Sequence, residues 1–305
     1  MPADCVSIVA AGHSRFGRLE GTTLEDLIVQ VTREALSDAE IDASQIDALF
    51  LGHFNSGLVP DGFAASLLLQ ADPGLRFKPA TRCENACASG SAAIQAGVNA
   101  ILSGSAELVL VVGAEKMTHT STAAVTQALA GAGYQNDPAE AGLSFPQLFG
   151  RAARQYAERY HCPLGSMAAI ATKNHSNAMA NPLAQMHREM NFEHCNNVSQ
   201  SNPFVADSLR LTDCSLISDG AAAIILASPK RARAFRREVQ IRAMTQVNDT
   251  LPVAQRDILA FEGPQRAIHA ALRGANVTLA DLSFAEVHDC FTIAELLIYE
   301  AMGLA

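Results

Sequence analysis

Several features are missing from this sequence, and each absence narrows the range of functions. The 305 residues contain no tryptophan, only 17% of them are charged, and the formal net charge is -9. A surface for nucleic-acid phosphates needs a basic cluster, usually interleaved with aromatic residues, and none occurs here. We therefore expect no nucleic-acid partner.

Long apolar runs and a leader segment are absent as well. The most apolar runs, at residues 108–114 and 220–227, are far shorter than the ~20 residues that span a bilayer. The start of the chain, "MPADCVSIVAAGHSRFG", lacks the basic segment and apolar core of a secretory signal. We expect a cytoplasmic protein without a membrane span.

The cysteine pattern argues against both disulfides and metal. The seven cysteines are odd in number and scattered, which favours free thiols in a reducing compartment. Cys83 and Cys87 have no second pair of Cys or His nearby in the sequence. His161 and Cys162 are adjacent, and adjacent side chains rarely point at one ion. We expect no metal site.

The order of apolar patterns predicts an α/β fold. Strand patterns alternate with helical ones as far as residue 117, in the order βαβαβαβ, and Thr23 is placed to cap the first helix. This order predicts a mixed or parallel sheet covered by helices. Residues 118–204 break the pattern and predict an insertion, and a buried strand at residues 216–228 resumes the sheet.

A second round of elements follows residue 228. Strand patterns at residues 238–248 and 284–291 alternate with helical patterns at 263–276 and 292–305, so the order of the first half repeats. We divide the chain into a first half (1–117 plus 205–228), an inserted domain (118–204) and a partial second half (229–305).

Cys87 is the first candidate for chemistry. It lies in "RCENACASGSAAIQAG", directly before a helix of small residues. The free amides and the dipole of a helix N-terminus favour an anion, so we expect a lowered thiol pKa and a nucleophilic thiolate. The small neighbours leave room for a substrate. The alternative is a cysteine that only packs in the core.

The second candidate is "EVHDCF", at residues 286–291. A predicted strand ends there and a helix begins, and such junctions display side chains into clefts. His288 offers a hydrogen-bond donor, and Cys290 a second thiol suited to general acid-base chemistry.

Together, "NACASG", "NHSNAMANPLAQ", "SLISDGAAAIIL" and "EVHDCF" resemble the thiolases, and among them the sterol-carrier-protein type, which has His-Asp-Cys-Phe where common thiolases have Asn-Glu-Ala-Phe. The resemblance runs along the whole chain. It implies two βαβαβαββ halves in a layered α/β arrangement, of which the second is incomplete here, with a loop domain inserted in the first. It also implies a tight homodimer or homotetramer.

The resemblance also implies residue roles. Cys87 becomes the acyl-accepting nucleophile, His288 part of an oxyanion hole for the thioester oxygen, and Cys290 the group that moves the α-carbon proton. Acyl-CoA and coenzyme A are then substrates, and no further cofactor is expected. The resemblance further implies a Gly-His-Pro histidine that activates the nucleophile, and the printed sequence lacks this motif.

The lacking motif keeps other functions open. One is a non-catalytic or truncated thiolase-like subunit that binds acyl-CoA or pairs with an OB-fold, zinc-ribbon protein. Another is a condensing enzyme of ketosynthase type, whereas a thiolase-like aldolase is disfavoured because Cys87 is present.

Three further residues are predicted to contact substrate. Asn174 and His175, in "KNHSNAMANP", match a loop-domain motif of the family, with polar capping of a helix end as the alternative role. Ser89 is included because it follows the nucleophile so closely. Basic residues of the insertion are either surface charges or contacts for coenzyme A phosphates: Arg151, Arg154, Lys173 and Arg188.

Overall fold

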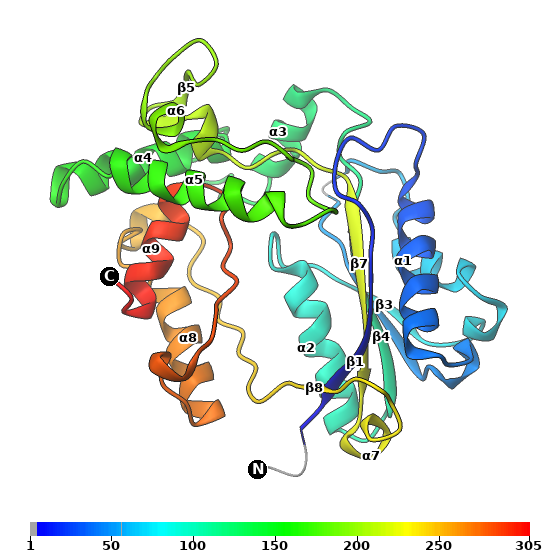
Figure 1. The fold of residues 1–305 in the computed structure, drawn as a ribbon. Helices are drawn as coiled ribbons and strands as arrows, with labels where there is room; N and C mark the ends of the chain where they lie inside the picture. Colours follow the sequence, from blue (N-terminus) through cyan, green and yellow to red (C-terminus); the bar gives the residue numbers. More distant parts are fainter. Residues whose placement is uncertain (1–4, 56) are drawn as a thin grey trace. The chain divides into compact units, whose positions relative to one another are not determined.

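The computed structural model describes residues 5–55 and 57–305, and the chain forms two compact units (Figure 1). Unit 1 comprises Met1–Ser121 and Ser218–Gln246, and unit 2 comprises Thr122–Ile217 and Val247–Ala305. Unit 2 thus combines most of the predicted insertion with most of the C-terminal segment. The division into two halves and an inserted domain remains a prediction.

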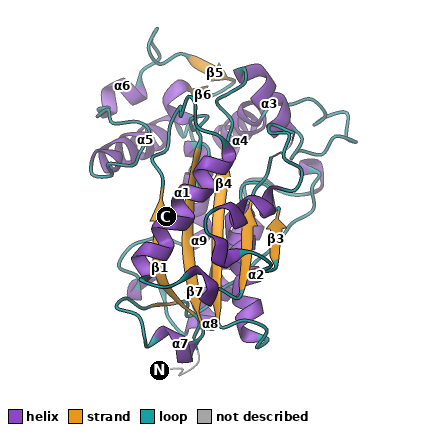
Figure 2. Cartoon of the chain, turned by 90° about the vertical axis from the view of Figure 1, so that its right-hand side faces the viewer, coloured by secondary structure: helices purple, strands orange, loops and turns teal. Residues whose placement is uncertain are grey.

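A six-stranded mixed sheet forms the centre of unit 1, in the order β3-β2-β4-β7-β1-β8 (Figure 2). Strand β2 runs parallel to β3 and β4, whereas β7 is antiparallel to β4 and β1. The prediction of a mixed sheet is therefore confirmed. The strands are β1 (Ser7–His13), β2 (Ala48–Gly52), β3 (Ala80–Cys83), β4 (Leu108–Glu115), β7 (Gly220–Ala227) and β8 (Val239–Gln240).

Local capping explains where the first helix of unit 1 begins. The Thr23 hydroxyl accepts the Asp26 N–H at 3.0 Å, and the Asp26 carboxylate accepts the Thr23 N–H at 2.9 Å, which confirms the predicted cap. The helical pattern at residues 61–71 forms a 3₁₀ helix. The helices of unit 1 are α1 (Leu24–Ala39), α2 (Ser89–Leu102) and α7 (Pro229–Ala232), with 3₁₀ turns η1 (Ala43–Gln45), η2 (Ala64–Gln70) and η3 (Pro73–Leu75).

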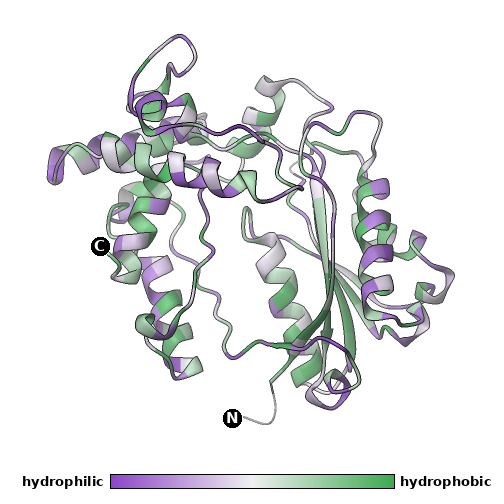
Figure 3. Ribbon diagram, in the orientation of Figure 1, coloured by the Kyte–Doolittle hydropathy of each residue, from purple (hydrophilic) through white to green (hydrophobic). Residues whose placement is uncertain are grey.

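Alternation along β4 buries both faces of the sheet. Leu108, Leu110 and Val112 belong to the apolar cluster that includes the inner side of α1, whereas Val109 and Val111 belong to the cluster around α2. Helices α1 and α2 thus cover opposite faces, and the strands are hydrophobic along their length (Figure 3). Both faces of β4 are therefore buried.

A buried carboxylate ties the start of β7 to the end of β4. Asp219 accepts hydrogen bonds from the Lys116 ammonium (2.6 Å), from the backbone N–H of Met117 and Thr118 (both 2.7 Å), and from that of Leu19 (3.1 Å). Burial alone raises the Asp219 pKa, but the bonds from Lys116 and Thr118 outweigh it and lower the pKa to about 2.

Unit 2 is mainly helical. Its core joins Tyr156 of α4, Met167 and Ile170 of α5, and Ile293 and Leu297 of α9. The elements are α3 (Thr122–Ala130), α4 (Phe145–Arg159), α5 (Leu164–Met179), α6 (Phe192–Asn196), α8 (Glu262–Ala275), α9 (Thr292–Met302), β5 (Phe204–Ala206), β6 (Leu209–Arg210), η4 (Leu211–Asp213), η5 (Val253–Gln255) and η6 (Leu279–Asp281).

The strand predicted at residues 284–291 is wrong. Within the described part of unit 2, only Phe291 bridges to Cys214, and the Ser215 N–H donates to the Cys290 carbonyl at 3.1 Å. A strand exists only with a neighbour that pairs along its length, and this segment has two such contacts. The strand predicted at 238–248 shortens to the two residues of β8. Across residues 5–55 and 57–305, no helix has the length and apolar character needed to cross a membrane.

Candidate active site

Cys87 lies on a tight turn between β3 and α2. The preceding residue, Ala86, has φ 46°, a left-handed conformation that is costly for a residue with a Cβ. The buried Ser89 hydroxyl stabilises the turn, because it donates to the Ala86 carbonyl at 2.7 Å and accepts the Asn85 N–H at 2.9 Å. Ser89 therefore shapes the turn that presents Cys87, and its contact with substrate remains a prediction.

Gly52 lets the end of β2 approach this turn closely. A Cβ on Gly52, at the end of β2, would lie 2.7 Å from both the Gly90 Cα and the Ser89 carbonyl oxygen. On the other side, no heavy atom of the described residues lies within 4 Å of a Cβ placed on Gly90. The first turn of α2 is therefore packed tightly against β2 on one side and open on the other.

The electrostatic environment of Cys87 differs from the expectation. The residue is exposed, but the surrounding protein removes enough water from the thiol to raise its pKa, and the Glu115 carboxylate adds to this rise. A backbone hydrogen bond opposes the rise without reversing it. The predicted lowering of the Cys87 pKa is therefore wrong, because desolvation outweighs the backbone hydrogen bond.

Glu115 is a residue that sequence reasoning missed. It ends β4 on the same face as Val109 and Val111, the face that α2 covers. Its carboxylate accepts backbone N–H groups from Phe54 and from Asn55, the latter at 3.4 Å. The available signal was its position as the first charge after the apolar run "LVLVVGA".

In unit 2, the segment that precedes α9 carries the second group of predicted residues. His288 is exposed, but the surrounding protein removes enough water from its ring to lower its pKa, which favours the neutral imidazole at physiological pH. Cys290 is half-buried, and its carbonyl is held by Ser215. Between them, burial raises the pKa of Asp289 to about 6, and the charge of Glu295 adds to the rise.

Asn174 belongs to the same group as Asp289. Its side-chain amide donates to Asp289 Oδ2 at 2.5 Å and to Glu295 Oε2 at 2.8 Å. The neighbouring His175 has a pKa lowered by burial. The structure thus places Asn174 beside Asp289 in unit 2 and Cys87 beside Ser89 in unit 1, and the substrate roles of Asn174 and His175 remain predictions.

Two basic residues of the predicted insertion form ion pairs within unit 2. Arg154 pairs with Asp207 at 3.0 Å, and Lys173 pairs with the buried Glu295. The charges of these two side chains are therefore already partly neutralised by the fold.

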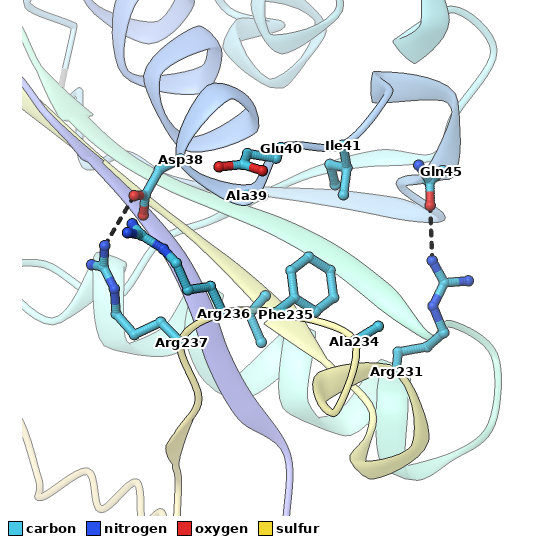
Figure 4. A pocket seen from close by; sticks show the side chains of 11 residues that line it. Asp38, Ala39, Glu40, Ile41, Gln45, Arg231, Ala234, Phe235, Arg236 and Arg237 are labelled. Atoms are coloured by element: carbon cyan, nitrogen blue, oxygen red, sulfur yellow. Dashed lines mark hydrogen bonds and ion pairs between the residues drawn. The ribbon is translucent and has the colours of Figure 1, made fainter.

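A cavity of about 460 Å³ lies in unit 1 near the end of α1 (Figure 4). Arg237 bonds Asp38 and Arg231 bonds Gln45 across it, each at 3.0 Å, and Arg236 points toward Asp38. Its lining includes none of the predicted site residues. Among the described residues of either unit, no three His, Cys, Asp or Glu side chains cluster as metal ligands would.

Comparison with known proteins gives the family. The pattern described as "Thiolase, N-terminal domain" matches residues 6–230, and "Thiolase C-terminal domain-like" matches residues 245–305. An acetyl-CoA acetyltransferase of Methanothermobacter thermautotrophicus is 35% identical over 300 residues, which cover 98% of this chain and 77% of that protein. Sterol carrier protein 2 of Oryctolagus cuniculus is 30% identical over 326 residues, covering 99% of this chain and 57% of that protein.

A solved structure entitled "Ltp2-ChsH2(DUF35) aldolase" has the same fold. Its TM-score is 0.80 at 20% identity, over 99% of this chain and 77% of that one. The family patterns cover most of the sequence, and the fold agrees with them. The chain therefore belongs to the thiolase family.

Proposed function

We propose that the protein is an acyl-CoA C-acyltransferase that cleaves 3-ketoacyl-CoA with coenzyme A or runs the reverse Claisen condensation. Cys87 attacks the keto carbon, the bond to the α-carbon breaks, and acetyl-CoA leaves. Coenzyme A then takes the acyl group from the Cys87 thioester. This covalent route divides one difficult step into two easier steps.

The observation that carries the proposal is the presentation of Cys87. An exposed thiol follows a left-handed alanine, stands at the start of a helix, and has open space beside the first helical turn. Such strain persists where surrounding structure holds it in place, and it is typical of functional turns. The relatives named acetyl-CoA acetyltransferase support the same chemistry.

His288 and Cys290 have separate roles in this proposal. A neutral His288 donates a hydrogen bond to the thioester oxygen as charge develops there. Cys290 removes the α-carbon proton in the condensation direction and returns it in thiolysis. Because burial raises the Cys87 pKa, the nucleophile also needs a proton acceptor. The family assigns that role to the histidine of a Gly-His-Pro motif, which residues 1–305 do not contain.

The proposal includes an assembly and a setting. We propose a homodimer or homotetramer, because β3 is an edge strand of the sheet and an unpaired edge is a template for another strand. Residues 229–305 form part of a second thiolase half, supported by the family pattern at 245–305. The substrates place the reaction in lipid and fatty acid metabolism.

The test is to locate the acyl group. The protein is incubated with acetoacetyl-CoA or acetyl-CoA, and peptide mass spectrometry maps the thioester. We expect acetylation at Cys87, its loss in Cys87→Ala, and no change in Cys162→Ala, which removes another exposed thiol. Equal labelling of wild type and Cys87→Ala would contradict the proposal.

A second candidate function is a non-catalytic subunit that binds acyl-CoA or an OB-fold, zinc-ribbon protein. One observation favours it: a thiol with a raised pKa is largely protonated at neutral pH and is a weak nucleophile without a base. Binding of acetyl-CoA without any transfer to Cys87 would support this alternative.

A further inference from the structure

A network of side chains in unit 2 surrounds the residue between His288 and Cys290. Helix α5 supplies Lys173 and Asn174, and helix α9 supplies the buried carboxylate of Glu295. Asp289, from the segment before α9, completes the network. The four side chains come from two parts of the chain, with Asn174 and Asp289 115 residues apart, so only the fold brings them together.

The hydrogen bonds of this network are distributed unevenly. Both oxygens of Glu295 are used, since Oε1 accepts from Lys173 and Tyr299, and Oε2 accepts from Asn174 at 2.8 Å. Asp289 Oδ2 accepts from Asn174 at 2.5 Å, whereas the buried Oδ1 has no partner among the described residues. The two amide hydrogens of Asn174 thus bridge two carboxylates, and Asp289 depends on Asn174 for its one hydrogen bond.

The charges explain why this bridge matters. Nearby Asp213 is paired with Arg210 at 2.8 Å, and both side chains are fully buried. Among the residues that the structure describes, Lys173 is then the one cation that faces the carboxylates of Asp289 and Glu295, and Tyr299 adds a neutral donor to Glu295. The carboxylates of Asp289 and Glu295 share one cation and repel each other when both are ionised. The Asn174 amide donates a hydrogen bond to each of them and so reduces this repulsion.

The backbone around Asp289 connects the Asn174 bridge to His288 and Cys290. The Cys290 carbonyl is held by Ser215, and Phe291 is extended, with φ -148° and ψ 142°. Asp289 points toward α5 and α9, where Asn174 binds it, and His288 and Cys290 are its two neighbours in the chain. A fixed Asp289 side chain therefore restricts the backbone that carries both residues.

We infer that Asn174 and Asp289 are positioning residues: the Asn174 amide bridges Asp289 to Glu295, and this anchor holds the segment that carries His288 and Cys290 in a fixed orientation. The catalytic consequence of this orientation rests on the proposed function, but the anchoring itself does not. Asn174 therefore acts through Asp289, without contact with the reacting atoms.

The thiols of unit 2 provide a test that needs no turnover. The protein is treated with iodoacetamide at pH 7.5, and adducts are quantified at three cysteines. Cys290 reports the segment, the exposed Cys162 is the reference thiol, and the fully buried Cys195 reports loosening of the whole unit. The measured quantity is the rate at Cys290 divided by the rate at Cys162.

Three variants separate anchoring from general stability. Asn174→Leu keeps the shape of the side chain but removes the bridge, and we expect the ratio to rise roughly 3- to 30-fold, which lies within the range of coupling between contacting side chains. Asn174→Gln retains two amide hydrogens and should recover much of the wild-type ratio. Asn177→Ala, at an exposed position of α5, is the matched control and should change nothing.

The outcomes decide the inference in each case. A raised ratio in Asn174→Leu with Cys195 still protected, and recovery in Asn174→Gln, supports it. An unchanged ratio in Asn174→Leu overturns it. If Asn174→Leu exposes Cys195, the decision rests on Asn174→Gln, in which Cys195 must remain protected. A Cys290-to-Cys162 ratio within about 2-fold of wild type then supports the anchor, and a ratio as high as in Asn174→Leu overturns it.

Activity gives a second readout, which depends on the proposed function. If wild type turns over acetoacetyl-CoA with coenzyme A, Asn174→Leu should lower kcat by about 100-fold with little change in KM, the effect of small misplacement of reacting groups. An unaltered kcat would overturn the catalytic part of the inference. If wild type shows no turnover, the proposed function fails, and the alkylation ratio alone judges the anchor.

Discussion

Replacing Asp289 by asparagine should stabilise unit 2 at neutral pH, although it removes a residue of the candidate site. Burial and the charge of Glu295 raise the pKa of this carboxyl from 3.8 to about 6. The ionised form is therefore less favourable in the folded protein than in the unfolded chain. The introduced amide has no charge, and its oxygen can still accept the hydrogen bond from Asn174.

The sign and size of the effect follow from linkage. Between pH 4 and pH 6 the folded state binds more protons than the unfolded state, so the free energy of unfolding falls as pH rises through this range. A difference of about two pH units corresponds to about 3 kcal/mol, and solvent screening of a partly buried group reduces it to roughly 1–2 kcal/mol. Asp289→Asn should recover this amount above pH 6 and remove the slope.

The assay uses a property of the sequence. The protein has no tryptophan, and its four tyrosines, Tyr134, Tyr156, Tyr160 and Tyr299, all belong to unit 2. Tyrosine fluorescence during urea unfolding therefore reports this unit selectively. Wild type, Asp289→Asn and the control Glu189→Gln, which removes an exposed carboxylate, are compared from pH 4 to pH 8. A less stable Asp289→Asn at pH 7.5, or an unchanged slope between pH 4 and pH 6, would refute the reasoning.

Three further predictions concern unit 1. Because burial raises its pKa above 9.0, Cys87 should react with iodoacetamide at a rate that is still rising above pH 9, and a plateau below pH 8 would contradict this. Asp219→Ala leaves Lys116 buried without its counter-charge and should destabilise unit 1 by about 3–5 kcal/mol in denaturant titrations followed by circular dichroism; a loss below about 1 kcal/mol would be inconsistent with a buried pair. Wild type should sediment as a dimer and Ala80→Pro, which removes an N–H on the side of β3 that faces away from β2, as a monomer, whereas a wild-type species of 32.3 kDa would count against the assembly.

Local signals explain which parts of the fold could be predicted. The first helix is specified by Thr23, Asp26 and its apolar spacing, all within one stretch, and the structure confirms it. The buried strands around Val111 and Ile225 are apolar without interruption, which needs no partner to be recognised. The motifs that identify the family also lie in short segments, so the family could be recognised from the sequence.

Contacts between distant residues explain the rest. The segment at 284–291 has the composition of a strand, but a strand requires neighbours that composition does not supply. The Cys87 pKa depends on packing and on Glu115, which is distant in sequence. Asn174 and Asp289 are 115 residues apart, so their hydrogen bond leaves no local pattern.

The position of β7 in the sheet affects how the chain folds while it is being synthesised. This strand lies between β4 and β1, and Glu115 pairs with Gly220 across the whole intervening insertion. A ribosome must therefore complete residues 122–217 before the middle of the sheet has its central strand, and the strands made earlier wait with unpaired edges. Closing so long a loop slows folding, but each doubling of its length costs only about 0.6 kcal/mol. The insertion can thus vary in length with little loss of stability. A longer insertion, however, leaves the unpaired strands of the nascent chain exposed to aggregation for longer.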